Sequence, residues 1–187
     1  PTLHVAATRE DRQLRYGENP HQRAALYRDQ GADPWWATAV QHGGVALSYL
    51  NLYDADAAWL LAHDLGTGGG ASAARPCVTI IKHANPCGAA VADTLADAYR
   101  LAFDCDPRSA FGGIVGLNQV VDEATVEAMV AAAQADVVIA PGYAPGVVEA
   151  LAAKRKNTRL LEAVAPVRAA RHLRPISGGW LVQEPHR

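Results

Sequence analysis

Apolar residues recur with helical spacing, at i, i+3, i+4 and i+7, in several segments of the chain. The segments are Ala58–Leu65, Leu95–Ala102, Val126–Ala133 and the shorter Val147–Lys154. Residues whose side chains commonly cap helices precede the first three, namely Asp54, Thr94 and Asp122. The pattern therefore predicts amphipathic helices that each bury one face.

Short runs of apolar and β-branched residues lie between these segments. The clearest are Cys77–Ile81, Gly113–Leu117 and Val137–Ala140, with Thr158–Leu161 as a further candidate. Continuous apolar character in such short runs is typical of strands buried on both faces. Because strands and helices alternate, the sequence predicts a layered α/β sheet. Weaker strand candidates lie earlier in the chain, at Ala24–Tyr27 and Thr38–His42.

Composition narrows the class of protein. A chain of 187 residues is long enough for a single domain with one hydrophobic core. Its formal net charge of −2 excludes a broadly basic surface and argues against nucleic-acid binding. Its three cysteines lack the spacing of a disulfide framework, which favours a cytoplasmic protein. No apolar run reaches the roughly 18 residues of a membrane span, and no signal peptide follows Pro1.

One glycine-rich stretch, Gly66–Ser72, raises the question of a phosphate-binding loop. Such a loop needs a Lys-Ser/Thr pair and a following helix that aims its backbone N–H groups at the anion. Here a strand candidate follows, and no lysine does. The stretch is therefore predicted to be a flexible linker.

The densest group of chemically versatile residues is Lys82–Gly88, directly after the Cys77–Ile81 run. Ligands of open α/β sheets bind outside the carboxyl ends of strands, so Lys82 and His83 are candidates for a site there. A lysine and a histidine side by side can divide proton removal and charge stabilisation between them. Asn85–Gly88 is predicted to be a tight turn that orients them. A solvated pair that ends an edge strand fits the same spacing.

Two further loops carry polar residues suited to ligand binding. Arg15–Gln22 contains an arginine and a tyrosine, which suit phosphate or ribose, although an ordinary Asn-Pro turn explains it equally well. Asp106–Gly113 ends in paired glycines that allow close approach of a ligand, or that simply join a loop to a strand. Asn51 precedes a predicted helix and Asp136 opens a strand, so capping and turn roles explain both.

A metal site is not expected. Zinc needs three or four ligands, usually paired at short spacing. Cys77 and Cys87 each lack the second cysteine that zinc deaminases place three residues later, and no His-x-Glu is present. Cys87 is also a weak candidate nucleophile, because no orienting third group is evident.

Taken in order, these motifs resemble the family of bifunctional purine biosynthesis proteins with AICAR transformylase and IMP cyclohydrolase activities. The resemblance covers essentially the whole chain. The matching segments are Arg15–Gln22, Leu47–Tyr49, Asp54–Trp59, Lys82–Gly88, Ser109–Ile114, Ile139–Gly142, Ser177–Gly179 and Leu181–Gln183.

The resemblance implies a cytidine-deaminase-like three-layer α/β/α fold without zinc. It also implies that residues 1–187 are the first subdomain of the AICAR transformylase. On this view the cyclohydrolase domain precedes Pro1, and a second deaminase-like half follows Arg187 with most of the folate site. The family works as a homodimer whose active site is shared between subunits, so the isolated chain is expected to have little or no activity.

The reaction implied is transfer of a formyl group from 10-formyltetrahydrofolate to the 5-amino group of AICAR, which gives FAICAR. Lys82 and His83 resemble the catalytic pair. His83 would remove the proton and Lys82 would stabilise the oxyanion or protonate the leaving nitrogen, but the reverse assignment of the base is also open.

Substrate contacts are likewise carried over by resemblance. Arg15 and Tyr16 match the nucleotide-binding pair, while Asn51, Gly112 and Asp136 match contacts to the AICAR ribose or base. Leu50 departs from the pattern, since bacterial relatives usually carry a second asparagine before Asn51.

Two other classes of function fit parts of the sequence. One is a nucleotide-binding or dimerisation module without catalysis. The other is a metal-dependent hydrolase built on His42, His63 and His83.

Overall fold

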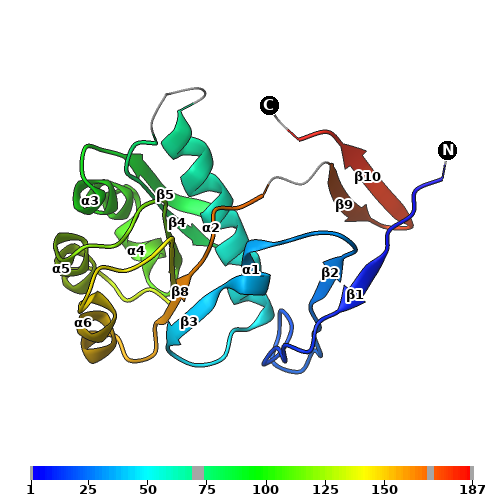
Figure 1. Ribbon diagram of the computed structural model, residues 1–187, viewed down its shortest axis with the longest axis horizontal. Helices are drawn as coiled ribbons and strands as arrows, with labels where there is room; N and C mark the ends of the chain where they lie inside the picture. The colour runs from blue at the N-terminus through cyan, green and yellow to red at the C-terminus, as the bar shows by residue number, and fades with distance from the viewer. Residues whose placement is uncertain (1, 69–73, 168–170, 186–187) are drawn as a thin grey trace.

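The main body of the protein is built on a six-stranded mixed β-sheet with the strand order β3-β8-β7-β6-β4-β5 (Figure 1). The computed structural model describes residues 2–68, 74–167 and 171–185. β6, β7 and β8 are parallel to one another, while β4 runs antiparallel to both β5 and β6, and β3 antiparallel to β8. The strands are β3 (Val40–Gly43), β4 (Cys77–Lys82), β5 (Asn85–Val91), β6 (Ile114–Leu117), β7 (Val137–Ala140) and β8 (Arg159–Glu162).

Helices cover both faces of this sheet. The long helix α2 packs on one face, against β4 and β6, and α3, α5 and α6 lie on the other (Figure 1). The helices are α1 (Trp35–Thr38), α2 (Tyr49–Thr67), α3 (Leu95–Cys105), α4 (Pro107–Ala110), α5 (Glu123–Ala131) and α6 (Val147–Lys154). The predicted three-layer α/β/α architecture is confirmed, whereas the cytidine-deaminase label stays a prediction.

Alternating side chains of the central strands form two separate cores. In β4, Val78 and Ile80 pack toward α3 and α5, while Ile81 packs toward α2. The face under α2 brings helix and sheet very close, because a Cβ at Gly116 would lie 2.7 Å from the carbonyl oxygen of Ala58. This small residue in β6 therefore fixes how near α2 lies to the sheet.

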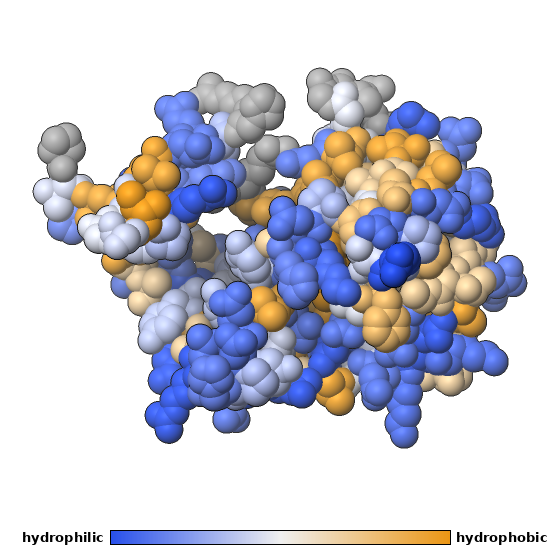
Figure 2. All heavy atoms as spheres, turned by 180° about the vertical axis from the view of Figure 1, so that it is seen from behind, coloured by the Kyte–Doolittle hydropathy of each residue, from blue (hydrophilic) through white to orange (hydrophobic). Residues whose placement is uncertain are grey.

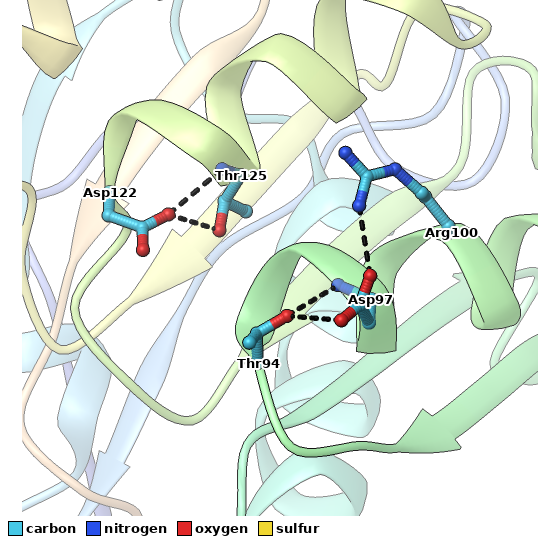
Figure 3. A network of polar contacts seen from close by, with 5 residues as sticks. All are labelled: Thr94, Asp97, Arg100, Asp122 and Thr125. Atoms are coloured by element: carbon cyan, nitrogen blue, oxygen red, sulfur yellow. Dashed lines mark hydrogen bonds and ion pairs between the residues drawn. The ribbon is translucent and has the colours of Figure 1, made fainter.

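Side-chain caps define where α3 and α5 begin on the second face (Figure 3). The Thr94 hydroxyl accepts a hydrogen bond from the Asp97 N–H at 3.1 Å, and Asp97 pairs with Arg100 at 3.0 Å. At α5, the Asp122 carboxylate accepts a hydrogen bond from the Thr125 N–H at 2.8 Å. Both starts agree with the sequence-based prediction.

The start of α2 differs from the prediction. The helix begins at Tyr49, capped by Ser48, and not after Asp54. Ser48 and Asn51 form a capping box in which each side chain accepts a hydrogen bond from the other's backbone N–H. Asn51 is thus the third residue of the helix and does not precede it, and Asp54 lies buried within the helix.

Two loop predictions are also corrected. Asn85–Gly88 is not a turn but the first part of β5, and the turn lies one step earlier, at His83 and Ala84. The Asp106–Gly113 loop contains the short helix α4, which Asp106 caps through the Ser109 N–H at 3.0 Å.

Two small antiparallel sheets lie beside the main body: β1 (Ala7–Arg9) with β2 (Tyr27–Asp29), and β9 (His172–Ile176) with β10 (Gly179–Gln183). Of these strands, only β2 had a sequence-based candidate, three residues too early. On the side of the molecule where these sheets lie, polar and apolar side chains are interspersed on the surface (Figure 2). Within the described residues, no helix is long and apolar enough to cross a membrane.

The glycine-rich stretch falls at the end of α2. Gly66 and Thr67 belong to the helix, and Gly68 ends it in the left-handed conformation, with φ of 53°. The rest of the linker predicted for Gly66–Ser72, residues 69–72, lies outside the described part of the chain.

Candidate active site

Candidate residues at the ends of three strands lie along one edge of the large sheet. This edge is formed by the carboxyl end of β4 and the amino ends of β6 and β7. Lys82 ends β4, Gly112 lies just before β6, and Asp136 lies just before β7. β4 is antiparallel to β6, with Ile81 opposite Ile114. Consequently the carboxyl end of β4 lies beside the amino ends of β6 and β7. The site was predicted at the carboxyl end of a strand, and of these three strands only β4 presents its carboxyl end here.

A two-residue turn holds the Lys82–His83 pair. It joins β4 to β5, and both of its central residues have positive φ, 55° at His83 and 58° at Ala84. Positive φ at both positions is the geometry of a type I′ turn, which favours Asn and Gly. With neither residue a glycine, the conformation costs about 1–2 kcal/mol per residue.

The carboxylate of Asp54 stabilises this turn from helix α2. Its two oxygens accept hydrogen bonds from the backbone N–H groups of His83, at 3.1 Å, and Ala84, at 2.7 Å. Sequence reasoning assigned Asp54 to a helix cap and missed this contact. A signal was present, because Asp54 stands four residues before Ala58 on the apolar face of the helix, where a carboxylate needs a partner.

A hydrogen bond joins Lys82 to the Phe111–Gly113 segment that precedes β6. The Lys82 ammonium donates a hydrogen bond to the carbonyl oxygen of Phe111 at 2.8 Å. Gly112 follows with φ of 69°, and its N–H donates to the carbonyl of Gln134 at 2.8 Å. The backbone N–H of Asp136 in turn donates to the Gly113 carbonyl at 2.9 Å. Lys82 is half-buried, and the imidazole of His83 is exposed.

The Arg15–Tyr16 loop lies against the beginning of α2. The Tyr49 N–H donates to the Tyr16 carbonyl at 3.2 Å, and the Arg15 N–H donates to the Leu47 carbonyl at 3.4 Å. Asp54 follows Tyr49 by five residues, or about 7.5 Å along a helix. The first turns of α2 therefore connect this loop, through Asn51 and Asp54, to the Lys82–His83 turn.

Arg159, the first residue of β8, is a buried cation at the same edge of the sheet. It was not among the residues predicted from the sequence. Its guanidinium donates to the carbonyl oxygens of Val45, at 3.2 Å, and Asp136, at 3.3 Å. Burial lowers the pKa of Arg159, and its charge interacts with Asp136, Arg15 and Tyr16. Its partners Val45 and Asp136 are far from it in the sequence, so no local pattern marked it.

A cavity lies at the Arg15–Tyr16 loop and not at the Lys82–His83 turn. Its volume is about 750 Å³ and it is lined by residues 9–16 and 20–25, including Arg9, Arg12, Arg15, Tyr16 and Arg23. A neighbouring cavity of about 330 Å³ includes Gly17 and Tyr49. The smaller cavity thus borders the amino end of α2, and neither cavity is lined by Lys82, His83, Gly112 or Asp136.

The histidines considered for a metal site are on separate elements. His42 in β3 pairs with Glu162 at 2.7 Å, and His63 in α2 bonds the Trp59 carbonyl at 2.9 Å. Across residues 2–68, 74–167 and 171–185, no group of three His, Cys, Asp or Glu side chains is placed to hold a metal ion. Burial raises the pKa of the Cys87 thiol, which makes it a poorer nucleophile.

Comparison with known proteins places these features in a family. The family model of the AICARFT/IMPCHase bienzyme matches residues 1–187. The bifunctional purine biosynthesis protein PurH of Mycobacterium leprae is 50% identical over 173 residues, which are 92% of this chain and 31% of that protein. PurH of Mycobacterium ulcerans is 48% identical over 172 residues, 91% of this chain and 31% of its own length.

A solved structure of RibD from Acinetobacter baumannii is 17% identical and superposes with a TM-score of 0.43, over 58% of this chain and 35% of that one. The chain spans about a third of the length of the curated relatives it matches. On the match over its whole length, the chain belongs to the AICARFT/IMPCHase bienzyme family.

Proposed function

We propose that this chain supplies the first part of the active site of an AICAR formyltransferase. The reaction moves a formyl group from 10-formyltetrahydrofolate to the 5-amino group of AICAR and gives FAICAR, a step of purine biosynthesis. The longer protein would also act as an IMP cyclohydrolase. Membership of the bienzyme family supports the activity, and the relatives carry the name of a bifunctional purine biosynthesis protein.

The observation that carries the assignment of residues is their convergence on one sheet edge. Lys82, Gly112 and Asp136 lie there through the antiparallel pairing of β4 and β6. Arg159 extends this edge toward Arg15 and Tyr16, with which its charge interacts. Arginine and tyrosine beside an open cavity suit the phosphate of a nucleotide.

Within this site Lys82 and His83 are the proposed catalytic residues. The amine of AICAR is a weak nucleophile, so removal of its proton is the step that needs a base. The exposed imidazole of His83 is free to approach a substrate from the tip of the turn. Lys82 is held by the Phe111 carbonyl and brings a positive charge to the same edge, where oxyanion character develops.

Substrate binding is assigned to Arg15, Tyr16, Asn51, Gly112 and Asp136. The Arg15 guanidinium carbon lies 5.2 Å from the centre of the Tyr16 ring, so the two side chains form one recognition unit. The side-chain Oδ1 of Asn51 accepts the hydrogen bond of the capping box, which leaves its Nδ2 group to contact a ligand.

The remaining features of the enzyme are proposed for the longer, cytoplasmic protein. Residues 1–187 would be the first deaminase-like subdomain of the transformylase. A cyclohydrolase domain, a second subdomain with most of the folate site, and a homodimer with a shared active site would complete it. The cavities at residues 9–25 are not lined by Lys82. This is consistent with a site that residues outside this chain complete.

AICAR titration by calorimetry tests this function. The Arg15→Ala variant should weaken binding by about 10- to 100-fold, since a hydrogen bond to a charged group contributes about 1.5–3 kcal/mol. Lys82→Ala should bind AICAR within about threefold of the parent, because it removes an interaction used mainly in the transition state. In the longer protein, Lys82→Ala should abolish formyl transfer.

Arg100→Ala is the matched control, because Arg100 pairs with Asp97 at 3.0 Å on α3 and neither residue lines the cavity. It should leave AICAR affinity unchanged. Equal affinity in the Arg15 and Arg100 variants would contradict the phosphate site. Full formyl-transfer activity in the Lys82 variant of the longer protein would refute the catalytic role of Lys82 and leave only the nucleotide-binding role of the chain.

A further inference from the structure

We propose that Asp54 is a positioning residue for the Lys82–His83 pair. Its carboxylate holds the left-handed turn through two backbone N–H groups and thereby fixes the direction in which the His83 side chain leaves the backbone. This inference rests on the proposed function, because it concerns the same catalytic pair.

The turn needs an outside contact to keep its shape. His83 and Ala84 both have positive φ, and neither is a glycine, so the local sequence alone disfavours this conformation. A turn of the same length with residues at negative φ would splay the strands and swing His83 to another side of the hairpin. The two hydrogen bonds that the Asp54 carboxylate accepts, at 3.1 and 2.7 Å, are made only when both backbone N–H groups point toward α2.

Asp54 is well placed for this role because it cannot easily move. Its exposed fraction is 7%, and it belongs to the second turn of α2, between the buried Leu52 and Ala55. The Thr79 hydroxyl ties the same helix to β4 by donating to the Ala58 carbonyl at 2.9 Å. The carboxylate therefore transmits the position of a rigid helix to the tip of the hairpin.

The same helix also positions the proposed nucleotide-binding residues. Tyr49 N–H bonds the Tyr16 carbonyl, and Ser48 and Asn51 cap the helix one turn before Asp54. α2 thus relates the base at His83 to the nucleotide-binding residues through a single rigid element. A change in the conformation of the His83–Ala84 turn should therefore slow formyl transfer without weakening phosphate binding.

The test uses the full-length protein that contains this chain, with Asp54→Asn as the main variant. An amide keeps one acceptor oxygen but presents an N–H₂ group to the second backbone N–H, so one of the two bonds is lost. The kcat for formyl transfer should fall by about 100-fold, the scale expected for a 1 Å misplacement of a reacting group. The KM for AICAR should change by less than about threefold, because phosphate contacts are intact.

A second substitution separates positioning from general stability. Glycine adopts positive φ without steric cost, so Ala84→Gly should let the turn form with less help. The double variant Asp54→Asn with Ala84→Gly should recover kcat by about tenfold over Asp54→Asn, on the same geometric scale. A variant with Ala89→Gly in place of Ala84→Gly should show no recovery, since Ala89 lies within β5 and outside the turn.

Asp56→Asn is the matched control on the same helix. Its carboxylate accepts a hydrogen bond from the Trp35 indole at 2.8 Å and touches neither His83 nor Ala84 through a described bond. The control should keep kcat even if its melting temperature falls. Equal loss of kcat in the two variants, or no rescue by glycine at position 84, would overturn the proposal.

Hydrogen exchange distinguishes failure of this inference from failure of the proposed function. In Asp54→Asn the backbone amides of His83 and Ala84 should exchange faster than in the parent and in Asp56→Asn. Unchanged exchange would refute the role of Asp54 whatever the reaction. Faster exchange in a protein whose parent form transfers no formyl group would confirm the contact and refute the formyltransferase assignment.

Discussion

Several aspartate side chains of this protein accept hydrogen bonds from backbone N–H groups that have no partner within their own helix or turn. Asp122 caps α5, Asp106 caps α4, and Asp54 holds the turn between β4 and β5. Hydrogen bonds to an ionised carboxylate are stronger than those to a neutral acceptor. At the residue scale, aspartate therefore fixes where elements begin and how the candidate catalytic pair is presented.

The cap at α5 gives a prediction for stability and its dependence on pH. Asp122→Ala should lower the free energy of unfolding by about 1 kcal/mol at neutral pH, a typical value for loss of an N-cap. Hydrogen bonds from Thr125 hold the pKa of Asp122 below its ordinary 3.8. A lowered folded-state pKa means that the stabilisation is complete above 3.8 and is lost as the pH falls through the lower folded-state value.

Urea unfolding of the parent and the variant across this range measures the effect. The difference in free energy should stay constant down to pH 3.8 and narrow below it. Asp93→Ala is the control, because that side chain is 98% exposed and its contact with Arg75 is 3.3 Å long. A difference that grows toward acid pH would show that Asp122 acts in another way.

At the scale of elements, hydrophobic patterning predicted the buried strands and failed where a partner outside the element decides the structure. Cys77–Ile81 and Val137–Ala140 were predicted within one residue of β4 and β7. β5 was missed because Pro86 in Asn85–Gly88 is typical of a turn. β5 is the last strand of the sheet, and an edge position tolerates proline, here beside a register shift at Ile80 and Ile81.

The contact between α2 and β6 gives a prediction at this scale. Gly116→Ala places a Cβ 2.7 Å from the Ala58 carbonyl oxygen, which is backbone and has little freedom to yield. Overpacking of this kind should destabilise the protein by about 1–3 kcal/mol. Gly179→Ala is the matched control, because nothing lies within 4 Å of a Cβ built there. Thermal unfolding of both variants measures the effect, and equal melting temperatures would contradict the close approach.

At the scale of the whole molecule, pairing between strands brings together candidate residues that are far apart in the sequence. Lys82 and His83 were predicted from their place after a strand, and the sequence carried no sign that β4 runs antiparallel to β6. That pairing brings Gly112 and Asp136 to the same edge. Arg159 was missed because an arginine at a strand start has no distinctive pattern until the loops around it are placed.

The same arrangement predicts how the 187-residue chain behaves alone. Two cavities lie at residues 9–25, one of them also bordered by Tyr49, and neither is lined by the Lys82–His83 turn, so these cavities do not join the nucleotide to the proposed base. General-base catalysis of formyl transfer requires the two substrates to be held in contact with that base. The isolated chain should therefore show little or no formyl transfer, whereas the longer protein should be active. A formyl-transfer assay on both, at equal concentration, measures this, and turnover by the isolated chain close to that of the longer protein would mean that these residues form a complete site.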